Sequence, residues 1–155
     1  MSIKFYRTKE QYGSFSNFSR HGFQLDGKFW PTSEHYFQAQ KFHEFIEYEE
    51  RVRLAPTPKE AANIGRDRSL PLRKDWEQVK DSIMRKGVLQ KFKTHEDIRK
   101  ILLSTGLEEI IEDSPIDYYW GIGATGTGRN MLGRILMEVR AELKAEELTN
   151  TICRD

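Results

Sequence analysis

Three polar side chains are spaced along one predicted helix in a pattern that suits a small-molecule site. Glu34, Gln38 and Lys41 lie within the stretch WPTSEHYFQAQKF, residues 30–42. At 3.6 residues per turn they share one narrow stripe, and Glu34 and Lys41 are about 10 Å apart along the helix axis. The rest of this helix is rich in aromatic residues, which is typical of a helix that lines a polar pocket. An ordinary polar edge in water has the same spacing.

Acid–base and nucleophilic chemistry are both within reach of these side chains. A carboxylate in an apolar pocket, such as Glu34, can donate or accept a proton, and a desolvated Lys41 can act as a nucleophilic amine. Asp117, in the segment EDSPIDYYWG, is a second carboxylate beside aromatic residues and therefore a second candidate for proton transfer. An exposed acid in a turn is the alternative for Asp117.

Aromatic and amide side chains could recognise a planar base. GSFSNF, residues 13–18, places Phe15, Phe18 and Asn17 together. A phenylalanine ring could stack on a heterocycle, while Asn17 could donate and accept hydrogen bonds at its edge. A turn in which the phenylalanines enter the core is the structural alternative. Trp120 is a further stacking candidate.

A basic segment has the composition of a phosphate site. GRDRSLPLRK, residues 65–74, contains Arg66 and Arg68. Arginine side chains match the geometry of phosphate oxygens and can bind them with two parallel hydrogen bonds. An exposed charged loop is the alternative, and Asp67 between the two arginines also allows internal pairing.

A glycine-rich segment is a second candidate for anion binding. WGIGATGTGRN, residues 120–130, directly precedes a predicted helix, so its backbone N–H groups could approach an anion closely. The side chains and backbone of Gly126, Arg129 and Asn130 are the binding candidates here. The spacing resembles GxGxxG, but neither a parallel βαβ pattern nor the Lys-Ser/Thr of a P-loop accompanies it, so a dehydrogenase or NTPase is not indicated.

We expect no metal and no cofactor. The four histidines show neither HExxH nor another compact ligand spacing, and the single cysteine, Cys153, has no CxxC partner. One cysteine also excludes an intrachain disulfide framework, which fits a reducing compartment.

Length and charge favour one cytoplasmic domain. The 155 residues suit a single domain over positions 1–155. The 25 Lys and Arg residues nearly balance the 24 Asp and Glu residues, so no general nucleic-acid affinity is expected. The first residues lack the apolar region of a signal peptide, and no stretch approaches the roughly 18 apolar residues of a membrane span.

The elements that must position the candidate residues are mainly helical. One helix is predicted to begin at about Ser33, after an N-cap at Thr32, and another to run from Pro58 to Gly65, after an N-cap at Thr57. Apolar periodicity predicts further helices over residues 46–55, 76–92, 95–106 (capped by Thr94) and 130–147.

Short strands complete the prediction. Residues 3–8 alternate, residues 22–30 form a hairpin around Asp26-Gly27, and residues 107–113 are β-branched, while YYWG at 118–121 could continue toward the sheet. The predicted fold class is α+β: a single mainly helical domain around a small antiparallel sheet.

Four segments together resemble the YbiA-like, or NADAR, family of N-glycosidases. The resemblance extends in order from about Phe5 to Arg140. The segments that carry it are GSFSNF, WPTSEHYFQAQKF, GRDRSLPLRKDWEQVKDSIM and YYWGIGATGTGRNMLGRILMEVR.

The resemblance implies hydrolysis of an N-glycosidic bond at a ribose carbon. Bacterial members of the family cleave early intermediates of riboflavin biosynthesis, which are ribosylaminopyrimidine phosphates, and so dispose of a reactive surplus. The expected partner of the chain is therefore a small-molecule substrate, with no membrane.

The resemblance also assigns expected roles to the candidate residues. Glu34 or Asp117 would handle protons and steady positive charge at the sugar, and Lys41 would either hold a substrate oxygen or form a Schiff base. Some relatives carry an acid where this chain has Ile122, which places more weight on Glu34 and Asp117. The expected substrate-binding residues are Phe15, Asn17, Gln38, Arg66, Arg68, Trp120, Gly126, Arg129 and Asn130.

Two alternative functions stay open at this point. An ADP-ribosyl glycohydrolase would act on ADP-ribosylated guanine in DNA, which is the only way in which nucleic acid would become a partner. A sensor without catalytic activity would bind ADP-ribose or a nucleotide and would not need Lys41.

Overall fold

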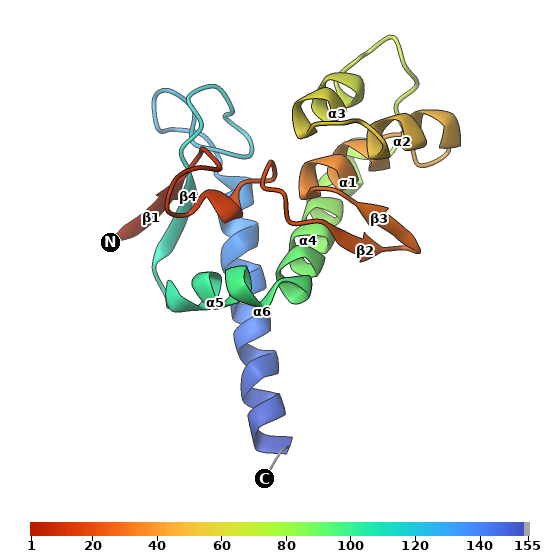
Figure 1. Cartoon of the computed structure of the whole chain (residues 1–155). Helices are drawn as coiled ribbons and strands as arrows, with labels where there is room; N and C mark the ends of the chain where they lie inside the picture. Colours follow the sequence, from red (N-terminus) through yellow and green to blue (C-terminus); the bar gives the residue numbers. More distant parts are fainter. Residues whose placement is uncertain (154–155) are drawn as a thin grey trace. The chain divides into compact units, whose positions relative to one another are not determined.

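A computed structural model describes residues 1–153 of the chain (Figure 1). The described part contains six α-helices, one short 3₁₀ turn and four strands, so the fold is α+β and mainly helical, as predicted. Its contacts divide the chain into two compact units, residues 17–91 and residues 1–16 together with the chain from residue 92 onward. None of the described helices combines the length and the apolar character that a membrane span needs.

The first unit, residues 17–91, opens with the predicted hairpin. Strands β2 (Phe23–Leu25) and β3 (Lys28–Trp30) pair antiparallel. Both residues of the turn have left-handed backbone conformations, with φ of 54° at Asp26 and 78° at Gly27. Asp-Gly is a favoured pair for such a turn, because its twist matches that of the flanking strands. The antiparallel sheet of the prediction is therefore confirmed.

Three short helices follow the hairpin and pack against one another: α1 (Ser33–Gln40), α2 (Ile46–Arg53) and α3 (Pro58–Gly65). The predicted N-caps are confirmed, because the hydroxyl of Thr32 accepts the N–H of His35 and that of Thr57 accepts the N–H of Glu60, each at 3.1 Å. Such caps pair N–H groups that the first helical turn leaves unsatisfied. Helix α3 ends at Gly65, also as predicted.

Aromatic side chains form the core of this unit. The Trp30 and Tyr36 rings meet edge to face, with their centroids 5.2 Å apart. Helix α4 (Trp76–Thr94) carries Gly87, where a Cβ atom would lie only 2.8 Å from the Tyr36 ring. A glycine inside a helix costs about 1 kcal/mol relative to alanine, and here it lets the Tyr36 ring lie against the helix backbone.

In the second unit, the strands predicted within residues 3–8 and 107–113 are present, but they pair with each other in a way that the sequence did not predict. Strand β1 (Ser2–Phe5) pairs in parallel with β4 (Glu109–Glu112), so Ile3 lies beside Ile110. The first strand thus joins a partner that is about a hundred residues away in sequence rather than the adjacent hairpin. Parallel pairing leaves no local turn signal, because its connection is long.

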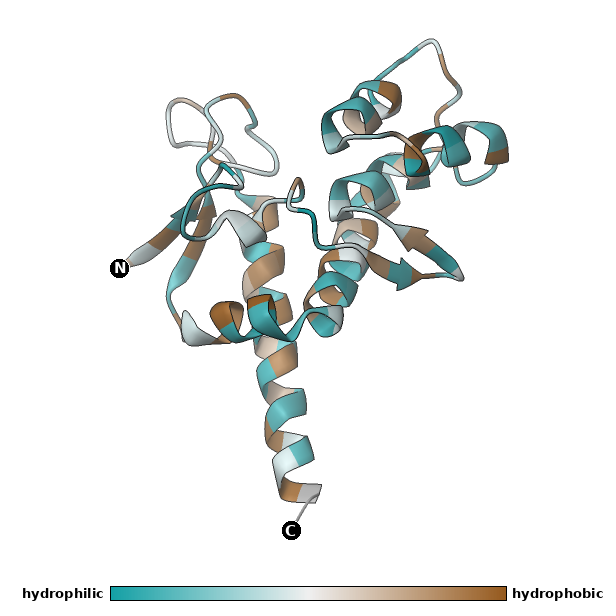
Figure 2. Cartoon of the chain, in the orientation of Figure 1, coloured by the Kyte–Doolittle hydropathy of each residue, from teal (hydrophilic) through white to brown (hydrophobic). Residues whose placement is uncertain are grey.

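Two helices belong wholly to the second unit, α5 (Glu96–Ser104) and α6 (Met131–Cys153), and α6 packs against both β4 and α5. Figure 2 shows hydrophobic and hydrophilic residues alternating along α6. Its predicted apolar face is confirmed, since five of its apolar side chains are buried: Leu132, Ile135, Leu136, Val139 and Leu143.

Two local predictions in the second unit were wrong. Thr94 is the last residue of α4, and His95 occupies the N-cap position of α5. The apolar periodicity of α4 continues to Phe92, and the helix ends two residues later. The Arg99 side chain donates hydrogen bonds to the carbonyl oxygens of Phe92 and Lys93 at this end.

The YYWG segment forms no strand, because its carbonyl groups accept hydrogen bonds from the segment that leads into α6. The extent of a single domain over 1–155 stays a prediction.

Candidate active site

Helix α1 is buried along its whole length, which decides between the two interpretations of its polar stripe. Only 6% of Glu34, 3% of Gln38 and 8% of Lys41 are exposed. The stripe is therefore not a polar edge in water. Buried polar and charged groups are costly unless they are paired or serve a ligand.

Lys41 follows the last residue of α1, and its amine is held by the end of α3. Its Nζ donates a hydrogen bond of 3.2 Å to the carbonyl oxygen of Gly65. The same Nζ lies 5.9 Å from the centroid of the Phe37 ring and 5.6 Å from that of Trp76, so two aromatic rings screen it from water. Cation–π contacts of this kind favour the charged amine, whereas burial opposes it.

Burial is the stronger of these effects. The pKa of Lys41 is lowered from 10.5 to about 8, first by burial and then by the positive charge of Arg68, with Glu34 acting in the opposite direction. A decrease of this size raises the fraction of neutral amine at pH 7 by roughly 300-fold. Lys41 thus meets the main requirement for a nucleophilic or proton-accepting amine.

Gln38 carries a polar atom without a partner. Its Oε1 atom is buried and has no hydrogen-bond partner among the described residues. The amide lies against Gly65, where a Cβ atom would be 2.7 Å from Cδ and 2.8 Å from Cβ of Gln38. An unpaired buried acceptor costs about 1–3 kcal/mol, a cost that a donor from a ligand would remove. The unpaired oxygen lies in the space that the missing side chain of Gly65 leaves, and the predicted contact of Gln38 with a substrate stays a prediction.

Glu34 and Asn17 meet at the start of α1. The backbone N–H of Glu34 donates to the carbonyl oxygen of Asn17 at 3.1 Å, and the Ser33 hydroxyl donates to Oδ1 of Asn17 at 2.9 Å. Glu34 is the acidic residue of the first helical turn, a position where the helix dipole favours a carboxylate. Asn17 thereby positions Glu34, and its predicted contact with a base stays a prediction.

The two candidate arginines lie just after α3 and are largely exposed. The Arg68 side chain donates hydrogen bonds to two backbone carbonyl oxygens, from Nη2 to Gly65 and from Nε to Arg66 at 3.2 Å. Asp67 accepts hydrogen bonds from the backbone and hydroxyl of Ser69. The exposure of both arginines agrees with the alternative of an exposed charged loop, and their predicted contact with a phosphate stays a prediction.

A third arginine of the basic segment is structural. Arg73 forms two hydrogen bonds with Asp75, of 2.7 and 3.1 Å, and its Nη1 donates to the carbonyl oxygen of Gln40. Its backbone N–H donates to the carbonyl oxygen of Lys41 at 3.0 Å. Arg73 thus holds the end of α1, and with it the backbone of Lys41.

In the second unit, Asp117 organises a turn beside Trp120. Its Oδ1 accepts the backbone N–H groups of Tyr119, at 2.9 Å, and of Trp120, at 2.8 Å. The half-buried Trp120 ring meets the Tyr119 ring edge to face, at 4.8 Å between centroids. One carboxylate oxygen of Asp117 is therefore engaged by the backbone, while its role in proton transfer stays a prediction.

The glycine-rich loop is closed by its own hydrogen bonds. The N–H groups of Met131 and Leu132, at the start of α6, donate to carbonyl oxygens of Tyr119 and Trp120, each at 3.0 Å. These two donors are therefore engaged without an anion. Gly126 is exposed and has φ of 76°, a conformation that favours glycine.

Two side chains of this loop differ in whether they can contact a ligand. Arg129 is exposed, with its guanidinium 5.6 Å from the centroid of the Tyr119 ring, so it can meet a ligand. Asn130 is buried, and its amide donates to Ile110 and accepts from Glu112, each at 2.9 Å. These bonds hold β4, and they do not support a substrate contact through the Asn130 side chain.

Phe15 lies in the core of the second unit. It is 1% exposed and packs against the rings of Phe5, Tyr12 and Phe92, with centroids 5.9, 5.4 and 6.0 Å away. This is the structural alternative that the sequence left open. A stacking role for Phe15 stays a prediction without support from its surroundings.

The structure distributes the candidate residues over both units. The first unit contains Asn17, Glu34, Gln38, Lys41, Arg66 and Arg68, whereas the second contains Phe15, Asp117, Trp120, Gly126, Arg129 and Asn130. Sequence reasoning missed Gly65, Phe37 and Trp76, which surround the Lys41 amine. Phe37 lies one helical turn from Lys41, a spacing that could have signalled the contact.

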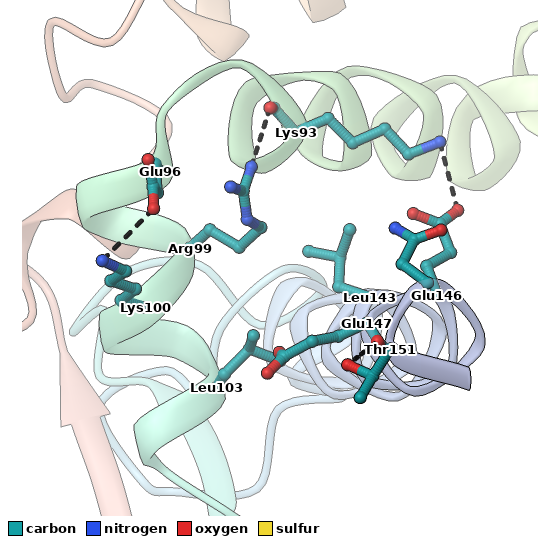
Figure 3. Close-up of a pocket in the computed structure, with 10 residues that line it drawn as sticks. Lys93, Glu96, Arg99, Lys100, Leu103, Leu143, Glu146, Glu147 and Thr151 are labelled. Atoms are coloured by element: carbon teal, nitrogen blue, oxygen red, sulfur yellow. Dashed lines mark hydrogen bonds and ion pairs between the residues drawn. The ribbon is translucent and has the colours of Figure 1, made fainter. Parts of the chain in front are cut away.

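An open groove of about 520 Å³ lies elsewhere, along α5 and the C-terminal half of α6 (Figure 3). Its walls pair opposite charges, with Lys93 3.3 Å from Glu146 and Lys100 3.2 Å from Glu96. None of the candidate site residues lines this groove. It is therefore separate from the chemistry considered above.

Comparison with known proteins identifies the family. The family model for the NADAR domain matches residues 4–144. The chain is 50% identical over 145 residues to N-glycosidase YbiA of Escherichia coli (strain K12), which covers 94% of this chain and 90% of that protein. It is 41% identical over 155 residues to the chloroplastic riboflavin biosynthesis protein PYRR of Zea mays, covering 91% of this chain and 25% of that protein.

A solved structure agrees with these relatives. The NMR structure of the E. coli protein YbiA superposes with a TM-score of 0.87 at 49% sequence identity, covering 96% of this chain and 89% of that one. The chain therefore belongs to the NADAR domain family, as a homologue of N-glycosidase YbiA.

Proposed function

We propose that this protein hydrolyses the N-glycosidic bond of ribosylaminopyrimidine phosphates, the early intermediates of riboflavin biosynthesis. The observation that carries the proposal is the buried stripe of Glu34, Gln38 and Lys41, with a partly neutral amine and an unpartnered amide. The similarity to N-glycosidase YbiA supports the reaction type, and the similarity to a riboflavin biosynthesis protein supports the substrate class.

Glu34 and Lys41 divide the chemistry in this proposal. The bond between the ribose C1′ and the base nitrogen breaks, the base leaves with a proton, and the oxygen of water is added to C1′. Glu34 steadies the positive charge that develops at the sugar, and Glu34 or Asp117 transfers the protons. Lys41 either holds a ribose or phosphate oxygen, or its neutral amine attacks C1′ of the ring-opened ribosylamine. In the second case the base amine leaves with a proton, a Schiff base forms between Lys41 and C1′, and water hydrolyses it to release the sugar and the free lysine.

The remaining candidate residues bind the two ends of the substrate. In the unit of residues 17–91, Arg66 and Arg68 are exposed beside the end of α3 and are proposed to bind a phosphate. In the other unit, Arg129 and the backbone at Gly126 are proposed as a second group that can bind an anion. Trp120 is proposed to stack on the pyrimidine, and Gln38 to bind a sugar hydroxyl.

Location and domain organisation complete the proposal. The NADAR match over residues 4–144 includes most of both compact units, which supports one domain over the whole chain. A single cysteine supports a cytoplasmic location. Apart from an ADP-ribosylated adduct, no nucleic-acid partner is proposed, since the net charge of +1 supplies little attraction for DNA.

The test is the release of free base from a ribosylaminopyrimidine 5′-phosphate. Purified wild type should turn the substrate over, and Glu34→Gln and Lys41→Ala should each lower kcat/KM by at least about 100-fold, the usual scale for a group that acts on the reacting atoms. Lys100→Ala, at an exposed lysine of α5, is the matched control and should retain wild-type activity.

The other outcomes separate the alternatives. Turnover of ADP-ribosylated guanine in DNA but not of the pyrimidine would keep the chemistry and reject the proposed substrate. Binding of both without turnover would favour a sensor. Borohydride trapping under turnover, followed by peptide mass spectrometry, decides the role of Lys41, because the absence of an adduct rejects the Schiff base.

A further inference from the structure

We propose that Arg68 is a positioning residue for the Lys41 amine, because its guanidinium shares the carbonyl oxygen of Gly65 with that amine at the end of α3. The proposal deepens the proposed function, since it names the residue that prepares the amine for its role. It rests on contacts within residues 17–91 alone.

Two cationic donors converge on one backbone oxygen. Lys41 Nζ donates to Gly65 O at 3.2 Å, and Arg68 Nη2 donates to the same atom. Arg68 is also anchored through Nε, which donates to the carbonyl oxygen of Arg66 at 3.2 Å. The guanidinium is planar and rigid, so two bonds to successive residues fix its position relative to the Lys41 amine.

The position of Gly65 explains why this sharing affects the charge of Lys41. Gly65 is the last residue of α3, where unpaired carbonyl groups carry the negative end of the helix dipole. Such an oxygen stabilises a nearby ammonium group. Arg68 occupies the same oxygen with a permanent positive charge, so the environment that would favour a charged Lys41 is neutralised.

The other charges around Lys41 do not replace this effect. Burial lowers the pKa of Lys41 most, and the positive charges of Arg68 and, to a smaller extent, Arg66 lower it further. The negative charges of Glu34 and Glu77 raise it. Phe37 and Trp76 contribute only aromatic faces. Among the charged groups that act on the amine, Arg68 is thus the largest one that favours the neutral form.

The predicted consequence is a higher titration midpoint of Lys41 when the charge at position 68 is removed. Acetic anhydride acetylates neutral amines, so acetylation of Lys41 as a function of pH, followed by peptide mass spectrometry, measures this midpoint without any substrate. Wild type should titrate near pH 8. Arg68→Gln should raise the midpoint by at least about half a pH unit, which means about threefold less neutral amine at pH 7.

Two variants control the experiment. Arg68→Lys restores the charge and should return the midpoint toward the wild-type value. Arg51→Gln removes an exposed arginine that lies over the Tyr48 ring in α2 and should leave the midpoint unchanged. Circular dichroism of each variant verifies that it is folded.

A measurement on the wild type covers the case in which Arg68→Gln does not fold. Raising NaCl from 0.02 M to about 0.5 M screens the exposed Arg68 more than the buried Glu34, so the wild-type midpoint should rise. A midpoint that is unchanged both by salt and in the folded Arg68→Gln variant overturns the proposal, as does an equal shift in Arg51→Gln.

The labelling experiment and the activity assay test the two proposals separately. If Lys41→Ala retains turnover while Arg68→Gln shifts the midpoint, the positioning role stands and the proposed role of Lys41 is wrong. If Lys41→Ala abolishes turnover and the Arg68→Gln midpoint is unchanged, only the positioning role is rejected.

Discussion

At the scale of single residues, Lys41 combines a cost in stability with a use in chemistry. A lysine whose pKa is lowered on folding binds its proton more weakly in the folded protein than in the unfolded chain. Below about pH 8 Lys41 is protonated in both the folded and the unfolded protein, so the burial of its charge destabilises the folded state fully. The difference between the pKa values of 10.5 and about 8 corresponds to about 3 kcal/mol. Between these two pH values the folded state loses the proton first, so stability rises with pH.

This cost predicts that removing the charge stabilises the protein. Lys41→Met should raise the free energy of unfolding at pH 7 by about 1–2 kcal/mol, because the lost hydrogen bond to Gly65 offsets part of the relieved cost. The difference from wild type should shrink as the pH rises from 8 to 10. Urea unfolding at pH 7.0 and pH 9.5 measures both effects. Lys91 is also buried with a lowered pKa, but it is present in wild type and in Lys41→Met, so its contribution cancels in the difference between them.

The matched control for this prediction is Lys59→Met, at an exposed lysine of α3. It should change the free energy of unfolding by less than about 0.5 kcal/mol at either pH. A Lys41→Met protein that is less stable than wild type at pH 7 would contradict the account, since packing and hydrogen bonding would then outweigh the burial of the ammonium group.

At the scale of elements, the site depends on how closely α1 and α3 approach. Because Gly65 has no side chain, the Gln38 amide can pack directly against it. The carbonyl oxygen of Gly65 accepts a hydrogen bond from the Lys41 amine. The backbone of α1 is fixed at both ends, by Asn17 at its start and by Arg73 at its end. Two short helices that are marginal in isolation thus become rigid through tertiary contacts.

The close approach predicts that Gly65→Ala is damaging although alanine favours helices. The new Cβ atom would lie 2.8 Å from Cβ of Gln38, which is not a flexible end of the side chain, so α1 and α3 must separate. We expect a loss of about 1–3 kcal/mol in the free energy of unfolding, the range for overpacking, and at least about tenfold in kcat/KM. Urea unfolding and base release measure these losses.

A double variant tests the cause. Gln38→Ala combined with Gly65→Ala removes the clash with the amide and should recover part of the stability but no activity, which appears as coupling in a double-mutant cycle. Asn63→Ala, on an exposed position of the same helix, is the control. Additive losses for Gly65 and Gln38 would show that the two positions do not interact.

At the scale of the whole molecule, the open question is whether the two compact units unfold together. Trp30 and Trp76 belong to the unit of residues 17–91, and Trp120 belongs to the other. One cooperative domain predicts the same urea midpoint from the fluorescence of a Trp120→Phe variant and from its circular dichroism at 222 nm, which reports helices of both units. Two separated midpoints would reject one domain over residues 1–155.

Much of the local structure could be predicted from sequence, because its causes are local. Thr32 and Thr57 begin helices through hydrogen bonds to residues three positions away, and Asp26-Gly27 turns a hairpin through its own backbone preference. The pairing of β1 with β4 had no such signal, since parallel strands are joined through long connections.

The sequence by itself determined the helical register that places Glu34, Gln38 and Lys41 on one stripe, because the period of a helix follows from backbone geometry alone. Its four characteristic segments also determined the family. Only the tertiary structure decided that the stripe is buried and that Lys41 and Arg68 both donate to the carbonyl oxygen of Gly65. Burial and charge are sums over neighbours that are distant in sequence, so the pKa of a lysine is a property of the fold rather than of the residue.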